Sequence, residues 1–116
     1  MKKSHQLTLA IIIVASILII AFAPDNVQNI PGELNKELAE CIGENSILYS
    51  KLGCSYCDIQ EEIFEDNYEY LNVVSCSFEK EKCIEAEITA TPTWSIQGEY
   101  YKGVQQIEKL KELTGC

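Results

Sequence analysis

The apolar and polar positions divide the chain into an apolar N-terminal run and a mixed remainder. Residues 7–23 contain no charged residue, a length at the lower limit for a membrane-spanning helix. Two lysines before the run and Ala21-Phe22-Ala23 at its end are also typical of a cleavable secretory signal. Because Pro24 follows the cleavage position, we expect an uncleaved anchor over residues 1–23, with a cleaved signal as the alternative.

Both interpretations of the run export the rest of the chain, and the charge pattern agrees with this. The 116 residues contain nine basic residues, all lysines, and eighteen acidic ones. Only two lysines precede the run, so the positive-inside bias keeps the N-terminus in the cytoplasm. The remainder carries a charge of about −11 and has no arginine, which argues against nucleic-acid binding. We therefore expect localisation in the cell membrane, with the domain on the extracytoplasmic side.

After a polar tether over residues 24–32, the pattern predicts one domain over residues 33–116, built in the order helix, strand, helix, strand, helix, strand, strand, helix. The expected elements are a helix from Glu33 to Gly43, a strand over 46–50, a helix from Cys54 to about Asp66 with Ile59, Ile63 and Phe64 facing inward, a strand over 70–76, a helix over 79–87, strands over 94–96 and 99–101 joined by a Gln97-Gly98 turn, and a closing helix marked by Val104, Ile107, Leu110 and Leu113.

This order predicts an α/β domain. The first two strands need a parallel crossover through the helix that begins at Cys54, and such crossovers are right-handed. The last two strands form an antiparallel hairpin. A mixed four-stranded sheet flanked by helices follows.

The central chemical motif is Cys54-Ser55-Tyr56-Cys57, which follows a strand and opens a helix. Unpaired N–H groups and the positive end of the helix dipole favour a thiolate there, and the thiolate is the nucleophile of disulfide exchange. Cys57 is close enough to attack a mixed disulfide formed at Cys54. We expect Cys54 and Cys57 to be catalytic; a structural disulfide, or half of a zinc site completed by Cys76 and Cys83, are the alternatives.

Thr91-Pro92 precedes an apolar strand, and a proline there can hold a cis peptide bond in a tight turn. In the context of a strand, C-x-x-C and a helix, we favour cis over trans. A loop of this kind exposes backbone groups that can pair with an extended substrate. Thr91, Pro92 and Tyr56 are therefore the candidate substrate-binding residues.

All six cysteines follow the apolar run, and an even count in an oxidising compartment implies pairing. We expect Cys76 and Cys83 to form a structural disulfide, with a second redox pair that relays electrons to Cys54 and Cys57 as the alternative. Cys41 and Cys116 are then expected to join the two ends of the domain. Two free thiols, or a bond to another chain, are the alternatives. No cofactor or metal is expected.

The sequence resembles the thioredoxin-like domain associated with vitamin K epoxide reductase homologues. The resemblance covers about 70 residues and rests on Leu48-Tyr49, Gly53-Cys54-Ser55-Tyr56-Cys57, Val73-Val74-Ser75-Cys76, Cys83, Thr91-Pro92-Thr93-Trp94-Ser95-Ile96, Gly98, Tyr101-Lys102-Gly103-Val104-Gln105 and Leu113-Thr114-Gly115. It implies a thioredoxin fold, a catalytic Cys54–Cys57 pair, a cis Pro92, and an extra cysteine pair at Cys76 and Cys83.

The same resemblance implies a path for electrons, from substrate thiols through Cys54 and Cys57 to a quinone-linked membrane partner. Two residues depart from the pattern: Gly53 stands where these domains have tryptophan, and Leu48 where many thioredoxins have a buried acid. The lost acid argues against an efficient reductase. From the Cys54–Cys57 pair, the expected anchor and the high density of cysteines, we expect an enzyme that oxidises exported protein thiols. A reductase or isomerase of the same fold, or a non-catalytic binding module held by disulfides, are the alternatives.

Overall fold

The computed structural model describes residue 6, residues 8–14 and residues 34–116. Two compact units, Met1–Ile30 and Pro31–Cys116, divide the chain, and each is described by itself. In the first, residues 8–14 are helical. None of the helices in the described ranges is long and apolar enough to cross a membrane. The rest of the expected anchor, and the tether over 24–32, lie outside the described residues.

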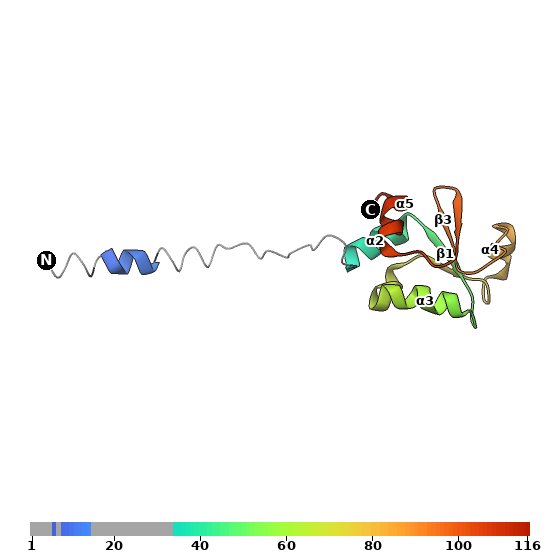
Figure 1. The fold of residues 1–116 in the computed structure, drawn as a ribbon, viewed down its shortest axis with the longest axis horizontal. Helices are drawn as coiled ribbons and strands as arrows, with labels where there is room; N and C mark the ends of the chain where they lie inside the picture. The colour runs from blue at the N-terminus through green and yellow to red at the C-terminus, as the bar shows by residue number, and fades with distance from the viewer. Residues whose placement is uncertain (1–5, 7, 15–33) are drawn as a thin grey trace. The chain divides into compact units, whose positions relative to one another are not determined.

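The second unit contains a four-stranded sheet and its helices (Figure 1). In chain order its elements are α2 (Lys36–Glu44), β1 (Ile47–Ser50), α3 (Ser55–Phe64), the 3-10 helix η1 (Glu65–Tyr70), β2 (Val73–Ser75), α4 (Lys80–Glu85), β3 (Thr93–Ile96), β4 (Glu99–Lys102) and α5 (Ile107–Thr114).

The strand order in the sheet is β2-β1-β3-β4. β1 and β2 are parallel, with Ser50 opposite Ser75, whereas β3 runs antiparallel to both β1 and β4. Gln97 and Gly98, which join β3 to β4, have φ angles of 51° and 79°, as the two-residue turn expected there requires. This is the mixed sheet predicted from the sequence, and its topology is that of the thioredoxin fold.

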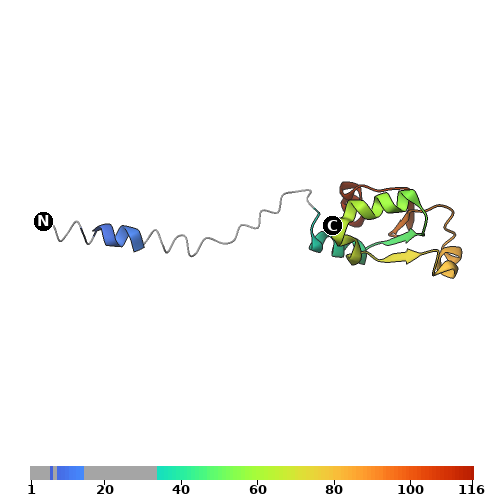
Figure 2. The same ribbon diagram turned by 90° about the horizontal axis from the view of Figure 1, so that it is seen from below.

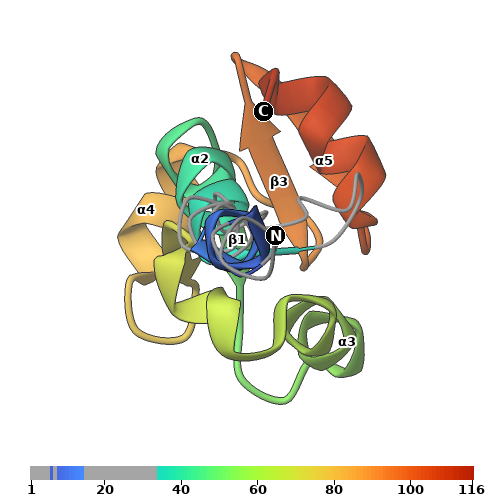
Figure 3. The same cartoon turned by 90° about the vertical axis from the view of Figure 1, so that its left-hand side faces the viewer.

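Side chains alternate along the strands, so the two faces of the sheet pack in two different clusters of buried residues. Leu48 and Trp94, opposite each other on β1 and β3, pack with residues of α2, α3 and α5 in the main core. Tyr49 and Val74 face the other way and pack with Cys83 of α4. Accordingly, α4 lies across β1 from α3 and α5 (Figure 3).

The sheet has two chemically different ends. In Figure 2 the arrows of β1 and β2 lie side by side and point toward α4, while α2 and the C-terminus lie at the other end. The loop that leads to Cys54 and the segment that begins at Cys76 both leave from the carboxyl ends of these strands. The topology thus brings Cys54 and Cys76 to one edge of the sheet.

Several expected boundaries were wrong around α3. The helix ends at Phe64 and continues as η1, so Tyr70 belongs to that turn and β2 is only Val73–Ser75. Ile59, expected to face inward, is 43% exposed, whereas Gln60 is fully buried. The buried residues of α3 are therefore Cys57, Gln60 and Phe64, while Ile63 is half-buried against the main core.

Gly43 of α2 lies against the end of η1, where an added Cβ would overlap the backbone carbonyl oxygen of Tyr70. We expect Gly43→Ala to lower the free energy of unfolding by about 1–3 kcal/mol, because backbone cannot yield as a flexible side chain does. Chemical denaturation monitored by circular dichroism measures this. Glu44→Ala, at an exposed neighbouring position, is the control; equal stability of the two variants would contradict the close approach.

Candidate functional site

Cys54 and Cys57 are joined in a disulfide at the start of α3. Cys54 is the N-cap residue, and its Sγ accepts a hydrogen bond from the backbone N–H of Cys57 at 3.2 Å. The sulfur of Cys54 thus occupies the position that a capping side chain takes at a helix N-terminus. An anionic sulfur would be stabilised there by the same N–H groups and by the helix dipole.

Thr91 contacts the sulfur of Cys54. Its hydroxyl donates to Cys54 Sγ at 3.5 Å, and its carbonyl oxygen lies 3.5 Å from the same atom. When the disulfide is reduced, that oxygen can accept a hydrogen bond from the Cys54 thiol. Thr91 therefore contacts Cys54 in a way that serves both oxidation states.

The residues expected to bind substrate differ in their exposure. The Thr91-Pro92 peptide bond is cis, but the Pro92 ring is fully buried, so Pro92 cannot offer its side chain to a substrate. Thr91 is half-buried, and Tyr56 is 67% exposed. Thr91 contacts Cys54, and Tyr56 lies two residues after Cys54 in the sequence.

Two exposed apolar side chains were not among the residues predicted to form the site. Leu52, two residues before Cys54, is 67% exposed, and Phe78 is 76% exposed. The backbone N–H of Leu52 donates to Ser77 Oγ at 3.0 Å, which ties the loop before Cys54 to the segment after Cys76. Leu52, Tyr56 and Ile59 in the segment after β1, and Phe78 in the segment after β2, are thus exposed apolar side chains.

Gln60 is a second feature that the sequence did not reveal. Its Oε1 accepts from Trp94 Nε1 at 3.0 Å and from the backbone N–H of Gln105 at 2.7 Å, and its Nε2 donates to the carbonyl oxygen of Gln105 at 3.0 Å. Gly103, in the same loop, donates to the carbonyl oxygen of Pro92 at 2.8 Å. Gln60 thereby fixes α3 to the loop that supports the Thr91-Pro92 turn.

Two tyrosines, Tyr49 in β1 and Tyr68 in η1, have raised pKa values. Burial raises the pKa of Tyr49, with a further rise from Tyr100 and an opposing effect of Lys82. Burial also raises the pKa of Tyr68, as does Glu61, while a hydrogen bond with Ser50 lowers it. Both phenols start from an ordinary pKa of 10.0, so both remain protonated at neutral pH. They supply no charge that could substitute for the missing buried acid; Leu48 is itself buried.

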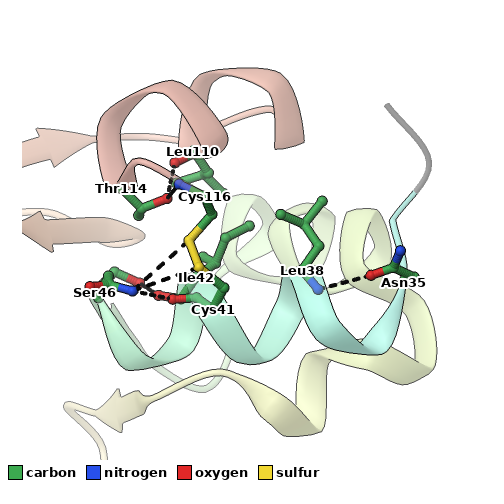
Figure 4. Close-up of a disulfide and its surroundings, with 9 residues drawn as sticks. Asn35, Leu38, Cys41, Ile42, Ser46, Leu110, Thr114 and Cys116 are labelled. Atoms are coloured by element: carbon green, nitrogen blue, oxygen red, sulfur yellow. Dashed lines mark hydrogen bonds between the residues drawn. A yellow bond between two sulfur atoms is a disulfide. The ribbon is translucent and has the colours of Figure 1, made fainter. Parts of the chain in front are cut away.

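The other four cysteines form two more disulfides, Cys76–Cys83 and Cys41–Cys116. The four cysteines considered above as zinc ligands are therefore paired in two disulfides, Cys54–Cys57 and Cys76–Cys83. Cys41–Cys116 joins α2 to the residue two after α5 (Figure 4). The C-terminus lies at the end of the sheet away from α4 (Figure 2). Asn45 Nδ2 donates to both of its sulfurs, at 3.8 and 3.9 Å.

Comparison with known proteins yields no matching family model. Among solved structures, the chain is similar to the alkylhydroperoxide reductase protein AhpF from Enterococcus faecalis (20% identity, 70% of this chain, TM-score 0.45) and to oxidised thioredoxin from Plasmodium falciparum (19% identity, 71% of this chain and 90% of that one, TM-score 0.45). It spans 44% of the reductase chain. The fold assignment rests on the strand order and directions described above.

Proposed function

We propose that this chain is an extracytoplasmic thiol–disulfide oxidoreductase that oxidises exported proteins through Cys54 and Cys57. The observation that carries the proposal is the Cys54–Cys57 disulfide at the N-terminus of α3, with Thr91 in contact with the sulfur of Cys54. The basic and apolar N-terminal segment supports an exported, membrane-anchored domain. The resemblance of the motifs supports reoxidation by a quinone-linked membrane protein similar to vitamin K epoxide reductase.

The two sulfurs take different roles in the proposed reaction. Cys54 is 9% exposed and Cys57 only 4%, so a substrate thiolate attacks Cys54 Sγ. The Cys54–Cys57 bond breaks as the mixed disulfide forms, and Cys57 leaves as a thiolate in the first turn of α3, where it takes up a proton. A second substrate thiolate then attacks the substrate sulfur of the mixed disulfide, which forms the substrate disulfide and releases Cys54. Two electrons and two protons pass to the domain.

Substrate binding in this scheme relies on contacts beside the pair rather than on a deep pocket. Thr91 presents its backbone next to Cys54, and an extended segment that contains the reacting cysteine can lie along it. Leu52 and Tyr56, both 67% exposed, offer apolar contacts on either side of Cys54 in the sequence. Such contacts select for unfolded, apolar segments, which newly exported chains expose.

Replacing Cys57 with alanine should trap Cys54 in mixed disulfides with its exchange partners. The Cys54 thiolate can still attack a disulfide of an oxidised substrate or of the reoxidising partner, in the reverse of the exchange above. The mixed disulfide that forms then lacks the Cys57 thiolate that would release Cys54 by internal attack. We expect Cys57→Ala, expressed in cells as the full chain, to accumulate mixed disulfides that disappear on reduction. Non-reducing electrophoresis followed by mass spectrometry identifies them.

Cys54→Ala is the matched control, because it leaves a thiol that is more buried and lies inside the helix. It should trap far less. If Cys57→Ala yields no trapped species, or if both variants trap equally, Cys54 is not the exchanging residue and the proposal fails.

The direction of electron flow separates the proposal from a reductase or isomerase. An oxidant has a reduction potential well above that of a reductant, about −120 mV against −270 mV in well-known examples. Equilibration of the full chain in graded thiol–disulfide buffers, with alkylation and mass assignment of each cysteine, measures this potential. A non-catalytic module held by its disulfides predicts instead that Cys54–Cys57 resists reduction as strongly as Cys41–Cys116.

A further inference from the structure

The Cys76–Cys83 disulfide lies at the same edge of the sheet as Cys54–Cys57. Ser50 and Ser75 are paired at the ends of the parallel strands β1 and β2, and the backbone N–H of Cys76 donates to the carbonyl oxygen of Ser50 at 2.7 Å. Cys54 follows Ser50 by four residues. The crossover topology therefore brings two disulfides, distant from each other in the sequence, to one side of the domain.

A surface pocket of about 140 Å³ connects this second disulfide to the residue that contacts Cys54. Cys76 and Cys83 line one part of it, Lys51 and residues 88–90 line others, and Thr91 completes it. Thr91 is also the residue whose hydroxyl and carbonyl oxygens lie 3.5 Å from Cys54 Sγ. Thr91 thus contacts the Cys54 sulfur and also lines the pocket of the second disulfide.

The pocket has the chemistry that disulfide exchange requires. Cys76 is half-buried, whereas Cys83 is only 6% exposed, so an incoming thiolate reaches Cys76 first. Lys51 lines the same pocket, and a cation close to the sulfurs would favour both the attacking thiolate and the thiolate that leaves.

Opening this disulfide would leave the main core in place. Cys83 belongs to the small cluster with Tyr49 and Val74, not to the cluster around Trp94. It is the only buried residue of the six-residue helix α4, and the bridge closes a separation of only seven residues. Cys116, by contrast, packs against the main core, and its bridge spans 75 residues.

From these observations we propose that Cys76–Cys83 is a second exchangeable disulfide, which accepts an electron pair from a substrate dithiol that enters the pocket beside Thr91. This inference rests on the proposed function. It implies that one domain accepts two electron pairs, one at each disulfide. A substrate thiolate attacks Cys76 Sγ, the Cys76–Cys83 bond breaks, and Cys83 leaves as a thiolate that takes up a proton. The second substrate thiolate attacks the mixed disulfide, forms the substrate disulfide and releases Cys76, which is protonated in turn.

A stoichiometric titration tests the inference. The fully oxidised full chain, in a mild detergent and without oxygen, is mixed with an excess of a synthetic peptide that carries two cysteines. Mass spectrometry counts the peptide disulfides formed per chain, and alkylation identifies the reduced cysteines. We expect two equivalents in the original protein, one in the Cys76→Ala, Cys83→Ala variant, and two in the Cys41→Ala, Cys116→Ala variant.

Failure of this inference is distinguishable from failure of the proposed function. A single equivalent that leaves Cys76 and Cys83 resistant to alkylation overturns the second site and leaves the function of Cys54 and Cys57 intact. A single equivalent that reduces only Cys76 and Cys83 overturns the proposed function. Because alkylation is mapped in the unsubstituted protein, the result stands even if a double variant fails to fold.

Discussion

Replacing Gln60 with leucine is expected to lower the free energy of unfolding by about 3–4 kcal/mol, since it removes every hydrogen bond of a fully buried side chain. The indole N–H of Trp94 loses its acceptor inside the core, and the backbone N–H and C=O of Gln105 lose theirs at a half-buried position. Each such group costs about 1–3 kcal/mol when it stays unpaired and buried. Leucine has a similar volume, so a cavity adds little.

Chemical denaturation monitored by far-ultraviolet circular dichroism measures the effect. Gln106→Leu makes the same chemical change at the next residue along from Gln105, at an exposed side chain without a capping hydrogen bond, and should alter stability by less than about 0.5 kcal/mol. In a double-mutant cycle with Trp94→Phe, the combined cost should be less than the sum of the two single costs, because the orphaned indole N–H is then absent. Additive costs would show that the two side chains are not coupled.

The hydrogen bonds of Gln60 also predict an effect of this substitution on disulfide exchange at Cys54 and Cys57. Gln60 holds the loop whose Gly103 N–H donates to the carbonyl oxygen of Pro92, and Pro92 follows the residue that contacts Cys54. A Gln60→Leu protein that folds should therefore exchange disulfides more slowly, even though Gln60 does not touch the reacting sulfurs in the described contacts.

The strands β1 and β2 were predictable because side chains on both of their faces pack against buried residues. Leu48 and Tyr49, like Val73 and Val74, point to opposite faces of the sheet, so each of these two strands is a short continuous apolar run. The C-x-x-C motif then fixed which end of the sheet carries the chemistry, since a strand that leads directly into a helix places the connecting loop at the strand's carboxyl end.

The helix that carries the motif was harder to predict. Ile59 and Gln60 are adjacent, and polarity alone places the isoleucine inside. Gln60 is nevertheless the buried one, because partners 34 and 45 residues away satisfy its amide. Such partners are invisible to a local pattern. The pocket that joins Cys76 and Thr91 escaped prediction for the same reason, because it exists only once β2 is placed beside β1.

The second large effect on stability is expected when the Cys41–Cys116 disulfide is removed. Replacing both residues with alanine should lower the free energy of unfolding by about 4 kcal/mol in the chain-entropy model, because the bridge closes a loop with a sequence separation of 75. The same replacement of Cys76 and Cys83, whose separation is seven, should cost about 2–3 kcal/mol. Denaturation monitored by the fluorescence of Trp94, the only tryptophan, compares the two variants with the original protein.

Local structure at the C-terminus adds to this difference. Cys116 N–H donates to Thr114 Oγ1 at 3.4 Å, and that hydroxyl donates to the carbonyl oxygen of Leu110 at 2.6 Å. The bridge therefore holds the end of α5 against α2, over the main core. If the Cys41 and Cys116 variant loses no more stability than the Cys76 and Cys83 variant, the terminal bridge does not constrain the unfolded chain as its length implies.

This stability difference bears on how the domain would keep its fold during the proposed redox cycle. A protein that exchanges disulfides at one edge of its sheet must keep its scaffold while those bonds open. Cys41–Cys116 lies at the other end of the sheet and packs on the main core, so it should stay oxidised at potentials that reduce Cys54–Cys57. Reducing the protein under graded conditions should release the thiols of the carboxyl edge first, and Cys41 and Cys116 only as the fold itself is lost.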